Sequence, residues 1–345
     1  MEPGLERFSR QILLQGIGPE GVKRLRSSKV TVVGCGALGS AETELLARAG
    51  VGAIRVVDRD VVDVTNLHRT HMVSERDASE GTPKAVACAR GVSMIDSSIK
   101  VEAVVDDVDS DNVIDLIADS DIVLDGTDNL ETRMLINEAA VKLSKPWIYA
   151  GVNSWYGTVM LIEPGKGPCL RCLMPSWGGA RESCDVIPTI GTVTTLVASV
   201  AAGLAVRYLA GDRPSPGELI VIDGRNMSIE KVSVQRNPDC PVCVHGRFEL
   251  LSRPASYGIS RLCGSRDYKV RLRERVGSAE ALAAKLEGRF RSVVARPSWV
   301  RVVTSRGQIV TIMPPRLATI EGAASEEEAV EAYNEVAEAA GLERL

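Results

Sequence analysis

The stretch Lys29–Asp60, KVTVVGCGALGSAETELLARAGVGAIRVVDRD, decides the fold. It predicts an apolar strand, a glycine-rich turn, a helix over residues 40–49 and a second strand that ends in Asp58. The glycines of the turn are Gly34, Gly36 and Gly39. Such a turn lets a phosphate approach the backbone and the N-terminal N–H groups of the helix. Asp58, about 20 residues further on, suits ribose hydroxyls, so the stretch predicts a nucleotide site that fits a dinucleotide and ATP equally well.

Length and composition set the broad class of the protein. The 345 residues suffice for two domains, and 45% hydrophobic with 25% charged residues is typical of a globular chain. The net charge of −4 does not favour a nucleic-acid partner, which would normally require a basic patch, so we expect none. The first thirty residues are charged throughout and lack an apolar signal core, which predicts a cytoplasmic protein. The apolar run over residues 190–210 is expected to be a buried core helix and no membrane span.

Polar residues that suit phosphates follow the second strand. Asp60, Asn66 and Arg69 lie in the loop RDVVDVTNLHR, and Lys84 opens the next predicted helix. Their positive and amide groups match phosphate and ribose oxygens, although a lysine at a helix start is often merely solvated. Arg10, on a short N-terminal helix, is open to the same two interpretations, a solvated charge or an arginine offered to a phosphate.

A second cluster follows the apolar strand Asp121–Asp125. The strand runs into GTDN, which places Asp128 and Asn129 at its carboxyl end. Ligands bind at this end of the strands in open α/β sheets. Asp128 is therefore predicted either to cap the following helix or to hold a magnesium ion beside the phosphates.

Eight cysteines occur in the chain, and in a cytoplasmic protein we expect ligands, nucleophiles or core residues and no disulfides. Two C-x-x-C pairs predict one structural zinc site, because four thiolates complete a closed tetrahedral shell; two separate redox pairs are the alternative. The four cysteines are Cys169, Cys172, Cys240 and Cys243. Cys184 precedes the apolar helix and is equally well interpreted as a nucleophile or as an ordinary exposed cysteine.

The order of the predicted elements indicates an α/β fold. Parallel strands with helices on both faces of a Rossmann-like mixed sheet are expected first, followed by hairpin-like strands in residues 151–250. From about Leu251 the pattern becomes a small separate α/β module with an acidic final helix. The expected domains are residues 1–250, which contain the nucleotide site and the C-x-x-C pairs, and residues 251–345.

Together these motifs resemble the MoeB/ThiF/HesA family, the bacterial and archaeal relatives of the ubiquitin-activating enzymes. The resemblance runs through residues 1–250 and rests on RFSRQILL, GCGALG, DRDVVDVTNLHR, the Pro83–Lys84 pair, DGTDN and both C-x-x-C pairs, in the family's order. The tail resembles a C-terminal module of some family members and assigns no chemistry.

The resemblance implies ATP-dependent adenylation of the C-terminal glycine of a small β-grasp protein ending in Gly-Gly. It implies that the glycine loop binds ATP, that Asp58 binds the ribose, that Asn66, Arg69 and Lys84 contact the phosphates, and that Asp128 holds magnesium. It also implies a homodimer in which Arg10 reaches the active site of the other subunit. Positive charge at the reacting phosphate is what adenylyl transfer needs from a protein.

Three active functions remain open on the sequence alone, beside a catalytically silent docking protein stabilised by zinc, against which the intact site residues argue. The leading one is an adenylyltransferase that serves a sulfur carrier for molybdopterin, thiamine or thiolated tRNA. The next is activation of a ubiquitin-like modifier for conjugation, with Cys184 taking the acyl group as a thioester. An NAD-dependent oxidoreductase on the same glycine loop is the third; Asn66, Arg69, Lys84 and Asp128 argue against it, because they suit a triphosphate and magnesium.

Overall fold

The computed structural model describes residues 5–177, 188–255, 257–261 and 267–345. The chain folds into two compact units. Among the described residues, unit 1 holds 5–104, 108–177 and 188–254, and unit 2 holds 105–107, 255, 257–261 and 267–345. Cys184 and Cys263 lie outside the described residues.

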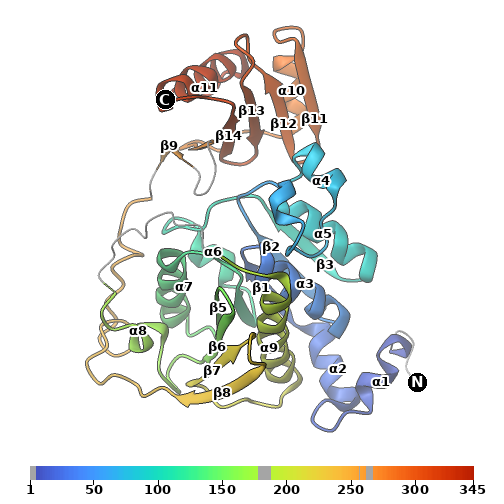
Figure 1. The fold of residues 1–345 in the computed structure, drawn as a ribbon, viewed down its shortest axis with the longest axis vertical. Coiled ribbons are helices and arrows are strands. Elements are labelled where there is room, and N and C mark those ends of the chain that lie inside the picture. Colours follow the sequence, from blue (N-terminus) through green and yellow to red (C-terminus); the bar gives the residue numbers. More distant parts are fainter. Residues whose placement is uncertain (1–4, 178–187, 256, 262–266) are drawn as a thin grey trace. The chain divides into compact units, whose positions relative to one another are not determined.

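Unit 1 is built on an eight-stranded mixed sheet with the order β3-β2-β1-β4-β5-β6-β7-β8 (Figure 1). The pairs from β3 to β5 are parallel and those from β5 to β8 are antiparallel. The strands are β1 (Lys29–Val33), β2 (Ala53–Val57), β3 (Lys100–Val104), β4 (Ile122–Asp125), β5 (Trp147–Asn153), β6 (Tyr156–Ile162), β7 (Glu218–Asp223) and β8 (Ser228–Ser233). The predicted Rossmann-like mixed sheet is confirmed.

Helices cover both faces of this sheet. Helices α3, α5 and α9 pack side by side on one face, and α6 and α7 pack together on the other. The helices of unit 1 are α1 (Ser9–Ile12), α2 (Gly18–Ser27), α3 (Ala37–Ala49), α4 (Glu75–Glu80), α5 (Lys84–Ile95), α6 (Val113–Ile117), α7 (Leu130–Leu143), α8 (Leu170–Leu173) and α9 (Gly191–Ala210), with 3-10 turns at Glu6–Phe8 and Val64–Asn66.

Helix α9 is the most apolar helix of the described chain, and by length and composition alone it could cross a membrane. It packs instead on α3, β5 and β6, and 56% of its apolar window is buried. Val197, Ala198 and Ala201 on its inner face are fully covered. The helix is therefore part of the core of unit 1, as the sequence predicts.

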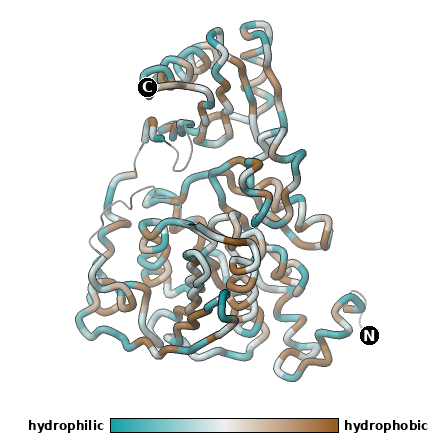
Figure 2. Tube along the Cα trace, in the orientation of Figure 1, coloured by the Kyte–Doolittle hydropathy of each residue, from teal (hydrophilic) through white to brown (hydrophobic). Residues whose placement is uncertain are grey.

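Unit 2 contains a six-stranded antiparallel sheet with the order β11-β12-β13-β14-β10-β9. Helices α10 and α11 pack on it and on each other, and Figure 2 shows hydrophobic and hydrophilic residues interspersed along α11. The elements are β9 (Gly258–Arg261), β10 (Tyr268–Arg271), α10 (Ala279–Leu286), β11 (Ser292–Arg296), β12 (Trp299–Val303), β13 (Ile309–Met313), β14 (Leu317–Glu321) and α11 (Glu326–Ala340). Its own apolar core includes Val300, Ile312 and Tyr333.

Candidate active site

The glycine loop joins β1 to α3, and each of its glycines has a different physical reason to lack a side chain. Gly34 has φ +87°, a left-handed conformation that favours glycine. A Cβ on Gly39 would lie 1.9 Å from the carbonyl oxygen of Gly34, so this glycine permits α3 to pack on the loop. A Cβ on Gly36 would meet no atom within 4 Å, so the space beside this backbone is open to a phosphate.

The same loop touches the turn that carries Asp128. A Cβ on Gly126 would lie 2.6 Å from both the carbonyl oxygen of Gly34 and the Cα of Gly39. The Gly126 N–H donates to the carbonyl oxygen of Val33 at 2.7 Å. Main-chain packing of three glycines thus fixes the nucleotide loop and the Asp128 turn against each other.

These glycines allow a matched pair of substitutions. Gly36→Ala should fold normally, because the residue has φ −80° and its Cβ enters empty space, yet it should raise the KM for ATP by about tenfold or more. Gly39→Ala should instead lower the free energy of unfolding by several kcal/mol, because the clash is with backbone. Thermal melts and ATP titrations of both variants check this; equal melting temperatures for the two would contradict it.

A buried ion pair clamps the turn in front of Asp128. Arg133 donates from Nε to Asp125 at 3.0 Å and from Nη2 to the carbonyl oxygen of Thr127 at 2.6 Å. The Asp125 carboxylate also accepts the Thr127 N–H and hydroxyl, at 2.9 and 2.6 Å. Asp125 is fully buried, so this pairing is what keeps a charge tolerable there. The clamp leaves Asp128 exposed at the end of β4.

Asn129 caps α7, because its side chain accepts the Thr132 N–H at 2.8 Å. The interpretation of Asp128 as that cap is therefore wrong, and a metal-ligand role is the one that stays predicted for Asp128. Asn66 also makes a local capping contact: its Oδ1 accepts the Asp63 N–H at 3.0 Å in the capping box of the 3-10 turn Val64–Asn66. Any contact of either asparagine with a nucleotide stays a prediction.

Glu42 on α3 lies beside the Asp125–Arg133 pair. Its side chain is fully buried, and neither carboxylate oxygen has a hydrogen-bond partner among the described residues. Burial, and then the charge of Asp125, raise the pKa of Glu42 well above its usual value. Burial therefore favours the protonated, uncharged form of Glu42 beside the Asp125–Arg133 pair.

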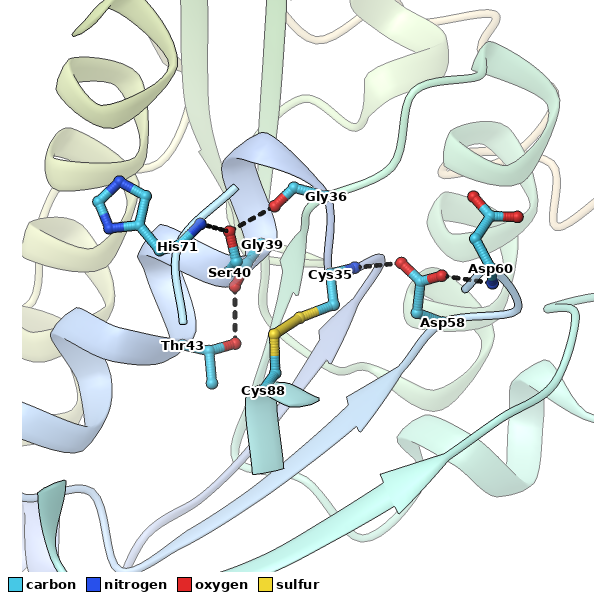
Figure 3. Close-up of a disulfide and its surroundings, with 9 residues drawn as sticks. All are labelled: Cys35, Gly36, Gly39, Ser40, Thr43, Asp58, Asp60, His71 and Cys88. Carbon is cyan, nitrogen blue, oxygen red and sulfur yellow. Dashed lines mark hydrogen bonds between the residues drawn. A yellow bond between two sulfur atoms is a disulfide. The ribbon is translucent and has the colours of Figure 1, made fainter. Parts of the chain in front are cut away.

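Asp58, directly after β2, connects the loop that follows this strand to the glycine loop by hydrogen bonds. One carboxylate oxygen accepts the Cys35 N–H at 2.6 Å and the other accepts the Asp60 N–H at 2.7 Å (Figure 3). Burial raises the pKa of Asp58 to about 6, partly offset by Lys84. The carboxylate is thus ionised at neutral pH and able to accept ribose hydroxyls, while its position is fixed by the loop.

The pKa of Asp58 predicts a pH dependence. Because the carboxylate is the better acceptor, the KM for ATP should rise about threefold to tenfold as the pH falls through about 6, and Asp58→Asn should flatten this profile. The free energy of unfolding responds in the opposite sense. Folding raises the pKa of Asp58 from 3.8 to about 6, so the protonated form of Asp58 favours the folded state at low pH. This contribution to stability is lost as the pH rises through about 6. Weaker ATP binding accompanied by unfolding near pH 5.5 would contradict the assignment.

Lys84, the first residue of α5, lies against Asp60. Its Nζ donates to the Asp60 carboxylate at 3.0 Å, and its backbone N–H donates to the Asp60 carbonyl oxygen at 2.8 Å. Burial acts to lower the pKa of Lys84, but Asp60, Asp58 and more weakly Asp128 outweigh it, and the pKa is raised. The ammonium therefore stays charged and lies within the electrostatic reach of the Asp128 carboxylate.

The two arginines of the predicted site are differently placed. Arg69 donates from Nη1 to the Thr65 carbonyl oxygen at 2.7 Å and lies 2.6 Å from the His68 ring nitrogen Nε2, so it belongs to the loop that follows β2. Arg10 is exposed on α1 and makes no hydrogen bond or ion pair with any residue that the structure describes. Arg10 is thus available to groups outside its own described chain.

The four cysteines of the C-x-x-C pairs come together. Their sulfur atoms all lie within 4.8 Å of one another, with separations of 4.0, 3.6 and 3.5 Å for Cys169–Cys172, Cys169–Cys240 and Cys172–Cys243. Ligands at about 2.3 Å from a tetrahedral zinc ion have sulfur atoms about 3.8 Å apart, so the donors and their spacing fit this metal. The alternative of two separate redox pairs is wrong, since sulfurs of both pairs share one cluster.

The structure corrects the expectation that the chain has no disulfide. Cys35, between Gly34 and Gly36, is bonded to Cys88 on α5 (Figure 3). Both cysteines are fully buried. Sequence reasoning missed this pair because the residues are 53 positions apart and form no C-x-x-C motif.

Comparison with known proteins gives the family. The pattern of the ThiF family matches residues 8–242. The chain belongs to the ThiF family. The sulfur carrier protein ThiS adenylyltransferase of Bacillus subtilis is 34% identical over 293 residues, which cover 84% of this chain and 87% of that protein. The predicted membership is therefore confirmed, and the match extends over most of both chains.

Two further relatives of this ThiF-family chain are informative. The SAMP-activating enzyme E1 of Haloferax volcanii is 38% identical over 245 residues, which cover 70% of this chain and 90% of that enzyme. Among solved structures, Escherichia coli MccB with ATP is similar, with a TM-score of 0.61 and 25% identity over 69% of this chain and 74% of MccB. Named relatives are adenylyltransferases, so the chain is a member of an enzyme family that transfers adenylyl groups.

Proposed function

We propose that the protein uses ATP to adenylate the C-terminal glycine of a small β-grasp sulfur-carrier protein that ends in Gly-Gly. The terminal carboxylate attacks the α-phosphate, pyrophosphate leaves, and an acyl-adenylate of the carrier remains. The name of the Bacillus relative, an adenylyltransferase of a sulfur carrier, supports this substrate class. The product would then accept sulfur for molybdopterin, thiamine or tRNA thiolation.

One observation carries the proposal: a glycine loop with open space beside Gly36 packs against the Asp128 turn, and the chain supplies charges suited to a magnesium triphosphate. Lys84 is held charged by Asp60, and Asp128 is exposed on a turn packed against the loop. A dinucleotide needs neither the lysine nor the exposed carboxylate. With membership in an adenylyltransferase family, this leaves the NAD-dependent oxidoreductase without support.

The roles of the residues follow from this arrangement. Asp128 would hold the magnesium ion, whose charge would neutralise the phosphates during transfer. Lys84 and Arg69 would neutralise phosphate charge, and Asp58 would orient the ribose. The remaining predicted nucleotide contacts are Gly34, Gly36, Gly39, Asp60, Asn66 and Asn129. Zinc, held by the four clustered cysteines, would be structural, because four thiolates leave it no open position.

We also propose a homodimer in which Arg10 acts on the active site of the partner subunit. Arg10 is exposed on α1, and the apolar side chains of Leu13 and Leu14 beside it are 76% and 56% exposed. Exposed leucines next to an exposed arginine suit a protein interface. In a mixing test, Arg10→Ala and Asp128→Ala enzymes should each be inactive, and their mixture should regain activity; no recovery would contradict the shared site.

The experiment that tests the function combines the enzyme, ATP, magnesium and each Gly-Gly carrier, followed by intact-mass spectrometry without reductant. A carrier that gains the mass of AMP supports adenylation; no adduct on any carrier, with no ATP–pyrophosphate exchange, would refute it. The Haloferax relative supports a second candidate, activation of a ubiquitin-like modifier. It requires an enzyme–carrier adduct that free thiol removes and that Cys184→Ser abolishes.

A further inference from the structure

The Cys35–Cys88 disulfide joins two elements of the proposed ATP site. Cys35 lies in the glycine loop, and Cys88 lies one helical turn after Lys84 on α5. The proposed function uses the backbone of this loop and the ammonium group of Lys84, yet assigns no role to the two sulfur atoms. The disulfide cross-links the loop to the helix, as Figure 3 shows.

A closed ring of contacts passes through this bond. From Cys35 the backbone N–H reaches the Asp58 carboxylate at 2.6 Å, and Asp58 accepts the Asp60 N–H at 2.7 Å. Asp60 then accepts both the Nζ and the backbone N–H of Lys84, at 3.0 and 2.8 Å. One turn of α5 leads to Cys88, and the disulfide closes the ring. Asp58, Asp60 and Lys84 in this ring are proposed nucleotide contacts.

We propose that this disulfide is a redox site coupled to ATP binding, in which the oxidised form binds ATP tightly and reduction by a dithiol weakens binding. This inference rests on the proposed function, since it presupposes the ATP site. In the reaction a dithiol gives two electrons and two protons, the Cys35–Cys88 sulfur–sulfur bond breaks, two thiols form, and the reductant becomes a disulfide.

The cross-link affects affinity because it limits the motion of the empty site. With the bond intact, the glycine loop and α5 keep Asp58 and Lys84 in one arrangement, and little freedom is lost when ATP binds. With the bond broken, the ring is held by hydrogen bonds and the Lys84–Asp60 ion pair. Ordering the loop and the helix then costs part of the binding free energy.

Linkage requires the reverse effect. If reduction weakens ATP binding by a given factor, ATP must disfavour reduction by the same factor. Burial gives a kinetic reason in the same direction: Cys35 and Cys88 are both fully covered, so a dithiol reaches them only when the loop or α5 opens. Bound ATP would oppose that opening.

The test measures ATP–magnesium binding by calorimetry before and after dithiothreitol treatment of the full-length protein. Alkylation and mass spectrometry count the free thiols at Cys35 and Cys88. We expect about tenfold weaker binding after reduction and, when saturating ATP–magnesium is present, a reduction equilibrium that lies about tenfold further toward the disulfide. Cys35→Ser/Cys88→Ser protein should bind with the affinity of the reduced form and should not respond to the dithiol. That variant keeps the four clustered cysteines, so it also reveals any effect of the dithiol on zinc.

The outcomes separate this inference from the proposed function. Failure of the oxidised protein to bind ATP at all would refute the proposed function. Equal affinities in both redox states, or ATP that leaves the equilibrium ratio of disulfide to thiols unchanged, would overturn the redox coupling while leaving the ATP site intact. Purified protein whose Cys35 and Cys88 stay as thiols after diamide treatment would overturn it as well.

Discussion

Asp128→Ala is expected to lower carrier-dependent ATP–pyrophosphate exchange by about a thousandfold, which corresponds to about 4 kcal/mol of transition-state stabilisation. The reason is local: Asp128 is the exposed carboxylate on a turn held by the Asp125–Arg133 pair and by main-chain packing of Gly126. Because its side chain is exposed, the substitution should leave the melting temperature nearly unchanged. Exchange rates over a range of magnesium concentrations measure the effect.

A matched control lies three positions along the chain. Glu131 is also exposed, and it forms a long ion pair of 3.6 Å with Arg253. Glu131→Ala should keep exchange within about twofold, as expected for a surface ion pair. Normal exchange in Asp128→Ala, or equal losses in the two variants, would remove Asp128 from the metal site.

The second large effect concerns the four-cysteine cluster. Cys240→Ser should lower the melting temperature by about 10 °C or more, or about 3–5 kcal/mol for a unit of this size. Cys169 and Cys240 are buried, and the proposed zinc would join α8 to the distant segment around residue 240. Loss of zinc therefore weakens the attachment between two parts of unit 1 that are far apart along the chain.

Metal analysis and melting curves check this prediction. Wild-type protein should contain one zinc ion per chain, and Cys240→Ser should contain less. Cys184→Ser is the control, because it removes a thiol and keeps all four clustered cysteines. A zinc-free wild-type protein, or a variant that melts normally, would show that these segments hold together without the metal.

Local signals were sufficient to predict the nucleotide loop and much of unit 2. The strand, glycine turn and helix of Lys29–Ala49 follow from apolar runs and glycine spacing, although α3 begins at Ala37 and not at residue 40, because Gly36 already acts as its N-cap. In the tail, unit 2 contains the small α/β module that is expected from about Leu251, and its acidic final helix is α11. Its strands β12 and β13 are mostly apolar, which is a clear local signal.

Features that depend on distant contacts could not be predicted from the sequence. β11 gives only a weak sequence signal, because it is largely exposed and carries little apolar alternation. The disulfide, the Glu42 carboxyl and the Arg133 clamp were missed for another reason: each depends on the register of segments that are far apart in the chain. Arg133 stands four residues after Asn129 in the predicted helix, one turn from the site, and that spacing was the available signal.

The contact among Gly34, Gly39 and Gly126 has a consequence for the evolution of the site. It consists of main-chain atoms, so no nearby side chain can shrink to compensate for a methyl group added at any of the three positions. Second-site suppressors of such a substitution should therefore be absent from a mutagenesis library. Laboratory selection for a different nucleotide would therefore have to act outside these three glycines, for example at Asp58 and Asp60 after β2.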